Sequence, residues 1–158
     1  MKTLDYIKLN ESGVKNVVNS LQNLLADFQV YYTNLRNFHW NIKGRGFFQL
    51  HEHFESMYTD VADKVDEVAE RILMLGGVPE SKFSNYLKVA RIAEMDSESN
   101  ADATIMNILE SLSHLIAEER KIIELAGEIN DEVTVAQMSD YLVEQEKQVW
   151  MLTAFMSK

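Results

Sequence analysis

Histidines and acidic side chains at helical spacing mark residues 38–71 as the part of the chain that could do chemistry. His51 and Glu55 stand four residues apart, about one helical turn. Asp66 and Glu70 have the same spacing, and two carboxylates one turn apart repel each other unless a cation lies between them. Imidazole nitrogen and carboxylate oxygen are ligands for iron(II), zinc and manganese. The pattern therefore predicts a transition-metal site.

The two pairs lie too far apart for one ion to reach both within one chain. Glu55 and Asp66 are eleven residues apart, which is about 16 Å along a helix, whereas a metal–ligand bond is about 2 Å long. A second copy of the helix, antiparallel across a twofold axis, would supply the missing half, and each dimer would hold two complete sites. His39 stands twelve residues before His51 and can fold back across the intervening turn to join the histidine half. We therefore expect a divided site at a dimer interface.

The order and spacing of these residues closely resemble the Dps family, the small dodecameric ferritins that protect DNA during starvation. The family pattern is His-Trp-Asn, a Gly-containing turn, a His with a carboxylate four residues later, and an Asp with a Glu four residues later in an Ala-Glu-Arg run. In this chain the pattern is carried by His39, Trp40, Asn41, Gly44, His51, Glu55, Asp66, Ala69, Glu70 and Arg71. Many members have aspartate where this chain has Glu55, so direct ligation by this longer side chain stays an open question.

The resemblance implies a ferroxidase whose ligands are His39, His51, Glu55, Asp66 and Glu70. Its substrate would be iron(II), oxidised preferentially by hydrogen peroxide. The ferric product would be stored as mineral inside a hollow homododecamer, with the metal sites at twofold dimer interfaces. Each of two irons gives one electron, so peroxide is reduced to water without release of hydroxyl radical.

Further acidic residues and one tryptophan acquire expected roles from the same resemblance. Trp40 is expected to pack beside the metal site. Asp60, Asp63 and Glu67 are expected on an acidic inner wall of the shell. An acidic cluster at the turn before the last helix would form threefold pores, with an ordinary solvated helix end as the alternative; its members are Glu124, Glu128, Asp131 and Glu132.

Apolar residues at three- and four-residue steps predict four long helices that position these side chains. We expect the helices at about Ser12–His39, Phe47–Leu75, Ala101–Gly127, and from the cap residue Asp131 onward. Gly76 and Pro79 end the second helix, and a long connection with a short amphipathic piece then leads to Asn100. Two hairpins joined by one such crossover predict an all-α, ferritin-like four-helix bundle with a short extra helix. The whole chain, 1–158, is expected to be one ferritin-like Dps domain.

Each histidine also has a structural interpretation. A single histidine at a helix end or in a core is more often hydrogen-bonded than ligating. We expect His53 to be solvated or to face a cavity, and His114 to be a hydrogen-bonded histidine of the bundle. No Glu-x-x-His pair occurs in the sequence, which disfavours a diiron site at the centre of one bundle.

Composition narrows the function classes. The chain has 158 residues, a net charge of −10 and no cysteine, so disulfides and thiolate chemistry are excluded. No signal peptide or membrane-spanning run is evident, and a cytoplasmic protein without membrane contact is expected. The excess of acidic residues favours the binding of cations over the binding of DNA phosphates. A DNA-binding nucleoid protein is nevertheless the competing hypothesis, although the short arm before the first helix mixes Lys2 and Lys8 with Asp5 and Glu11. That arm is expected to be partly ordered and to pack on a neighbour.

Overall fold

The computed structural model describes residues 2–157, and every regular element in that range is a helix. Four helices are long, and two are short; in chain order they are α1 (Thr3–Ile7), α2 (Glu11–Asn41), α3 (Phe47–Met74), α4 (Phe83–Val89), α5 (Ala101–Gly127) and α6 (Glu132–Met156). The expected long helices are confirmed to within about two residues at each end. No helix in the described part is both long and apolar enough to cross a membrane.

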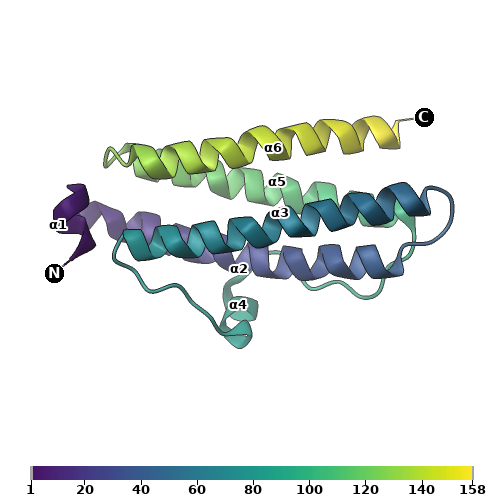
Figure 1. Cartoon of the computed structure of the whole chain (residues 1–158), viewed down its shortest axis with the longest axis horizontal. Helices are drawn as coiled ribbons and strands as arrows, with labels where there is room; N and C mark the ends of the chain where they lie inside the picture. Colours follow the sequence, from purple (N-terminus) through teal and green to yellow (C-terminus); the bar gives the residue numbers. More distant parts are fainter. Residues whose placement is uncertain (1, 158) are drawn as a thin grey trace.

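The long helices form two antiparallel hairpins, α2 with α3 and α5 with α6, packed into one bundle (Figure 1). The crossover from α3 to α5 runs back along the outside of α2 and carries α4. It ends where α2 ends, since the Lys43 amide donates to the Ser99 carbonyl at 3.2 Å. The third long helix therefore runs parallel to the second, as the crossover length predicted. This is the ferritin-like arrangement expected from the sequence.

Apolar stripes of the four long helices meet in one continuous core. The apolar residues that recur at three- and four-residue steps along α2, from Val14 to Phe38, are all buried or half-buried, because α2 packs against both α3 and α5. Large side chains fill the centre without remaining exposed area; they include Leu21, Leu24, Phe28, Leu35, Phe38 and Phe54. Burial of this kind contributes about 25 cal/mol per Å² of apolar surface and holds the hairpins together.

The end of α3 and the start of the chain meet at Gly76. Gly76 has a φ of +79°, which L side chains rarely adopt. The Gly77 amide then donates back to the Ile72 carbonyl at 2.9 Å, which closes the helix end. Leu4 of α1 lies against Gly76 and is buried. The short helix α1 was not predicted, and the arm packs on its own chain.

Polar side chains on α2 fasten the crossover to the bundle. Asn34 accepts from the Met95 amide at 3.0 Å and donates to the Ala93 carbonyl at 2.8 Å. One oxygen of Asp27 accepts from the backbone amides of Arg91 and Ile92 at 2.6 and 3.0 Å. These bonds satisfy backbone groups of a segment that has little regular structure of its own.

Asp27 also binds the imidazole of His114. His114 Nε2 donates to the second oxygen of Asp27 at 2.8 Å, with the carboxylate almost fully buried. The prediction that His114 is a hydrogen-bonded bundle histidine is confirmed.

Asp27→Ala should destabilise the chain by about 3 kcal/mol, because it removes the acceptor of two backbone amides, of which that of Ile92 is buried, and of one imidazole N–H. We expect a lower urea midpoint and faster hydrogen exchange at the amides of Arg91 and Ile92. The matched control is Asp140→Ala, which removes an exposed carboxylate in the interior of α6. Equal exchange at both amides in the two variants would contradict the role of Asp27.

Candidate metal centre

His39, His51 and Glu55 come together where α2 ends and α3 begins. One ligand atom of each lies within 4.8 Å of the others, and no other such group of three occurs among the described residues. His39 is buried in the last turn of α2, His51 is half-buried in the second turn of α3, and Glu55 is exposed one turn later. Gly44 and Gly46, both with positive φ, make the tight turn that brings the two helix ends together.

The two imidazoles hold each other in place through the backbone. His39 Nδ1 lies 2.8 Å from the His51 carbonyl oxygen, and His51 Nδ1 lies 2.8 Å from the His39 carbonyl oxygen. A carbonyl oxygen only accepts, so each Nδ1 must carry the proton. In the neutral rings both Nε2 atoms then have a free lone pair, which is the state that ligates a metal.

Aromatic packing fixes the ring planes as well. The imidazoles stack with centroids 3.8 Å apart and an interplanar angle of 21°. Phe47 stacks on His51 at 5.1 Å, and the Tyr58 ring meets the His39 ring edge to face at 5.4 Å. The histidines are therefore positioned before any metal arrives. Such preorganisation lowers the entropic cost of binding.

Asp66 and Glu70 stand elsewhere on α3. The helix is continuous from Phe47 to Met74, so the eleven-residue separation from Glu55 remains a distance of about 16 Å. Both carboxylates are exposed, and neither has a hydrogen bond or ion pair within residues 2–157. The structure thus joins three of the five predicted ligands and leaves the carboxylate pair apart, as a divided site requires of one chain.

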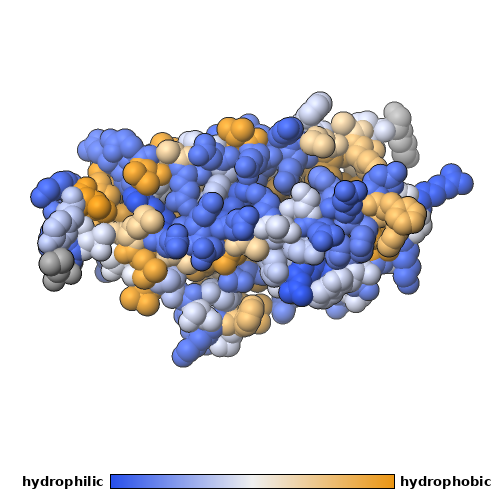
Figure 2. All heavy atoms as spheres, in the orientation of Figure 1, coloured by the Kyte–Doolittle hydropathy of each residue, from blue (hydrophilic) through white to orange (hydrophobic). Residues whose placement is uncertain are grey.

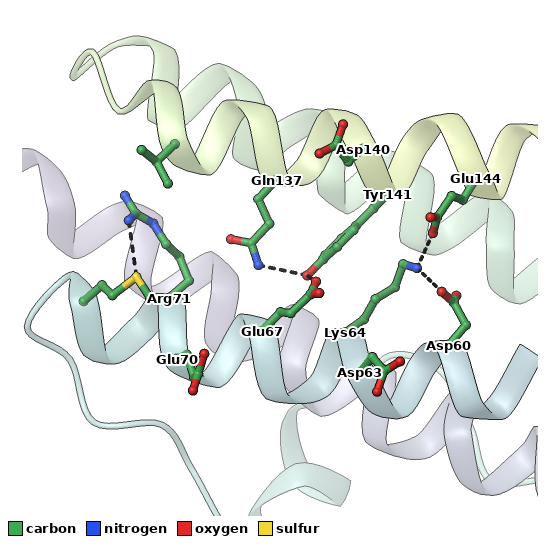
Figure 3. A pocket seen from close by; sticks show the side chains of 12 residues that line it. Asp60, Asp63, Lys64, Glu67, Glu70, Arg71, Gln137, Asp140, Tyr141 and Glu144 are labelled. Carbon is green, nitrogen blue, oxygen red and sulfur yellow. Dashed lines mark hydrogen bonds and ion pairs between the residues drawn. The ribbon is translucent and has the colours of Figure 1, made fainter.

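A cavity of about 580 Å³ opens between α3 and α6, beside Glu70 (Figure 3). It is lined by the three residues expected on an acidic inner wall, Asp60, Asp63 and Glu67. Its charge is partly neutralised. The Lys64 ammonium donates to Asp60 at 2.6 Å and to Glu144 at 2.5 Å.

Protonation states in this cavity follow from burial and from Lys64. Burial raises the pKa of Asp60 even though the Lys64 ammonium opposes this shift. Burial alone would lower the pKa of Lys64, but its hydrogen bonds to Asp60 and Glu144 outweigh this and raise it. Burial also raises the pKa of Tyr141, whose hydroxyl donates to Glu67 at 2.6 Å. The lysine therefore stays charged at neutral pH.

One expectation needs correction. Asp131 cannot belong to an acidic pore, because it is 2 % exposed and pairs with Arg71 at 2.6 Å. Its role as the cap of the last helix is confirmed, since it accepts from the Thr134 amide at 3.1 Å. Packing of Trp40 beside the metal site stays a prediction, because one chain holds only the histidine half of that site. The Trp40 ring is 62 % exposed and lies under the Arg36 guanidinium at 4.6 Å.

His53 is half-buried, and burial lowers its pKa. It is absent from the cluster of His39, His51 and Glu55. The reciprocal backbone bonds of His39 and His51 were not predicted from the sequence. A histidine in the last turn of one helix, twelve residues before a second histidine in the opening turns of the next helix, is the sequence signal that could have suggested them.

Comparisons of the sequence with known proteins agree on one family. The ferritin-like domain model matches residues 18–158. The DNA protection during starvation protein of Porphyromonas gingivalis is 54% identical over 157 residues, which is 99% of each chain. The protein of that name from Helicobacter pylori is 37% identical over 87% of this chain and 96% of its own.

Solved structures agree with the sequence matches. The crystal structure of a DPS protein from Vibrio cholerae O1 superposes with a TM-score of 0.92 at 47% identity, covering 94% of each chain. That protein is described as a member of a broad superfamily of ferritin-like diiron-carboxylate proteins. Dps from Staphylococcus aureus gives a TM-score of 0.88 at 31% identity, covering 91% and 97%. A bundle of this topology, with matches over nearly its whole length, belongs to the Dps family of ferritin-like proteins.

Proposed function

We propose that this chain is a ferroxidase subunit that oxidises iron(II), preferentially with hydrogen peroxide, and stores the ferric product as mineral inside a homododecamer. The observation that carries the proposal is the locked histidine pair, whose Nε2 atoms are free for a metal and lie beside Glu55. Membership in a family of ferritin-like proteins supports iron as the substrate.

The complete site would lie across a twofold interface. His39, His51 and Glu55 from one subunit would face Asp66 and Glu70 from its partner. The unpartnered carboxylates, four residues apart on an exposed face of α3, support this arrangement because a cation would relieve their repulsion. Two irons give two electrons to one peroxide, and two protons complete its conversion to two waters.

Assembly has support from the exposed apolar surface. Large side chains remain exposed although they are apolar, among them Phe48, Val78, Phe83 and Trp150 at 81, 81, 69 and 67 %. The face shown in Figure 2 is mainly hydrophilic, with hydrophobic atoms gathered toward both ends. Apolar side chains that gather in a patch are typical of surfaces that contact other subunits.

DNA binding as the main function is disfavoured. The Lys2 ammonium, in the short arm of mixed charge before α2, is paired with Glu11 at 3.0 Å, and the net charge is −10. A phosphate backbone would meet more repulsion than attraction on such a surface.

Iron(II) added with hydrogen peroxide should be oxidised at least tenfold faster than iron(II) added in air alone. We expect this because the divided site presents two irons to one two-electron oxidant. The measurement is stopped-flow absorbance of ferric product, with the His39→Ala, His51→Ala variant as control. Equal rates in that variant and in the wild type would contradict the proposed site.

A further inference from the structure

A buried hydrogen bond between a glutamate and a glutamine lies inside the bundle, between α5 and α6, and the glutamate has no ion pair within residues 2–157. Glu119 is fully buried, and Gln145 is 4 % exposed. Gln145 Nε2 donates to Glu119 Oε1 at 2.6 Å. The neighbouring turns of the two helices are apolar, with Leu115 and Ile122 on α5 and Leu142 on α6. The carboxyl group of Glu119 therefore has no contact with bulk water.

One oxygen of each head group has no hydrogen-bond partner within residues 2–157. These atoms are Glu119 Oε2 and Gln145 Oε1, and neither contacts a donor within residues 2–157. If Glu119 were ionised, both atoms could only accept. A buried anion with an unmet oxygen, beside an unmet amide oxygen, is costly because both groups lose their hydrogen bonds to water.

The charged and titratable groups around Glu119 do not resolve this conflict. The positive charge of Lys64 on α3 acts on Glu119, but its ammonium already donates to Asp60 and Glu144 (Figure 3). It makes no hydrogen bond to Glu119. Tyr141 on α6 donates its hydroxyl to Glu67. The phenol of Tyr31 on α2 is also buried, but its hydroxyl makes no hydrogen bond within residues 2–157 and so gives Glu119 no donor; burial and the charge of Asp60 raise its pKa.

We propose that Glu119 is a proton-binding site, held in the folded chain as a neutral carboxylic acid whose Oε2 hydroxyl donates to Gln145 Oε1. The two head groups then form a ring of two hydrogen bonds around one bound proton. One proton satisfies both unpartnered oxygens, since they belong to head groups that the 2.6 Å bond already joins. Burial raises the pKa of Glu119 to about 8, against the opposing effects of Gln145 and Lys64, which agrees with this state at neutral pH.

A proton bound only in the folded state couples stability to pH. The ordinary glutamate pKa of 4.5 describes the unfolded chain, and the value in the folded chain is about 8. Between these values the folded chain keeps a proton that the unfolded chain has released. The contribution of Glu119 to the free energy of unfolding therefore falls as pH rises through this window, and it levels off above pH 8.

Glu119→Gln tests the proposal, because a glutamine amide reproduces both hydrogen bonds of the neutral acid and has no proton to lose. From pH 5 to pH 9 the unfolding equilibrium constant of the wild type should rise about a thousandfold relative to that of the variant. The measurement is denaturant unfolding of the assembled protein at one fixed concentration. Glu110→Gln, an exposed glutamate on the same helix, is the matched control and should follow the wild type.

Infrared spectroscopy of the wild type gives a second readout that needs no variant. A neutral carboxylic acid absorbs at a higher wavenumber than a carboxylate, so an acid band should be present at pH 6.5 and fall to about half its intensity near pH 8. Glu119→Gln should lack the band. Parallel stability profiles of wild type and Glu119→Gln, or a wild type without an acid band at pH 6.5, would overturn the proposal. Either result would mean an ionised Glu119 hydrated by a buried water.

Discussion

Two inactive variants, dissociated, mixed equally and reassembled, should recover about a quarter of wild-type iron oxidation. One variant lacks the histidines (His39→Ala, His51→Ala), and the other lacks the carboxylate pair (Asp66→Ala, Glu70→Ala). Each alone should be inactive, because every site in its shell lacks one half. In mixed shells each site draws its histidines from one chain and its carboxylates from another. Each draw is right half of the time, which gives the quarter.

The helix geometry makes this outcome specific to a divided site. The continuous helix α3 keeps Asp66 about 16 Å and Glu70 about 22 Å from Glu55 in their own chain, so the two halves cannot meet within one chain while α3 stays helical. The control is Asp63→Ala, Glu67→Ala, which removes another carboxylate pair four residues apart on the same helix and should retain initial oxidation. If mass spectrometry shows mixed shells and no activity returns, the shared site is refuted.

The bundle could be predicted because its signals are local and repeated. Apolar residues at regular steps predicted α2 and α3. Gly76 predicted the end of α3, because glycine tolerates the positive φ that a helix end often needs. The histidine half of the site could be predicted for a similar reason. His39 and His51 flank a short turn, so their proximity follows from the hairpin itself.

Contacts between distant segments could not be predicted in this way. Asp27 and Asn34 sit on a helix whose apolar stripe already explained its burial, and only the structure places the crossover on their side. Asp131 looked like one of four acidic residues at a turn. In the structure Asp131 is buried in an ion pair with Arg71, sixty residues earlier. Residue spacing along the sequence does not predict a contact between segments so far apart.

That ion pair ties the end of α3 to the start of α6. Arg71 Nη2 donates to Asp131 at 2.6 Å, and Arg71 Nε donates to the Thr134 hydroxyl at 2.9 Å. The Thr134 hydroxyl in turn donates to the second oxygen of Asp131 at 2.5 Å. Both charged side chains are less than a tenth exposed. Every polar atom of the carboxylate therefore has a partner, which is the condition under which a buried pair is stable.

Arg71→Met should lower the free energy of unfolding by about 3 to 5 kcal/mol, since it leaves the carboxylate of Asp131 buried without its cation. For a chain of this size we expect a fall of about 10 °C in the melting temperature. Arg120→Met is the matched control, because Arg120 pairs with Glu146 at 2.5 Å between α5 and α6, but with both side chains more than half exposed. Exposed pairs contribute at most about 1 kcal/mol, so this control should melt within about 3 °C of the wild type. Equal losses in the two variants, measured by calorimetry at one protein concentration, would show that burial does not set the strength of the Arg71 pair.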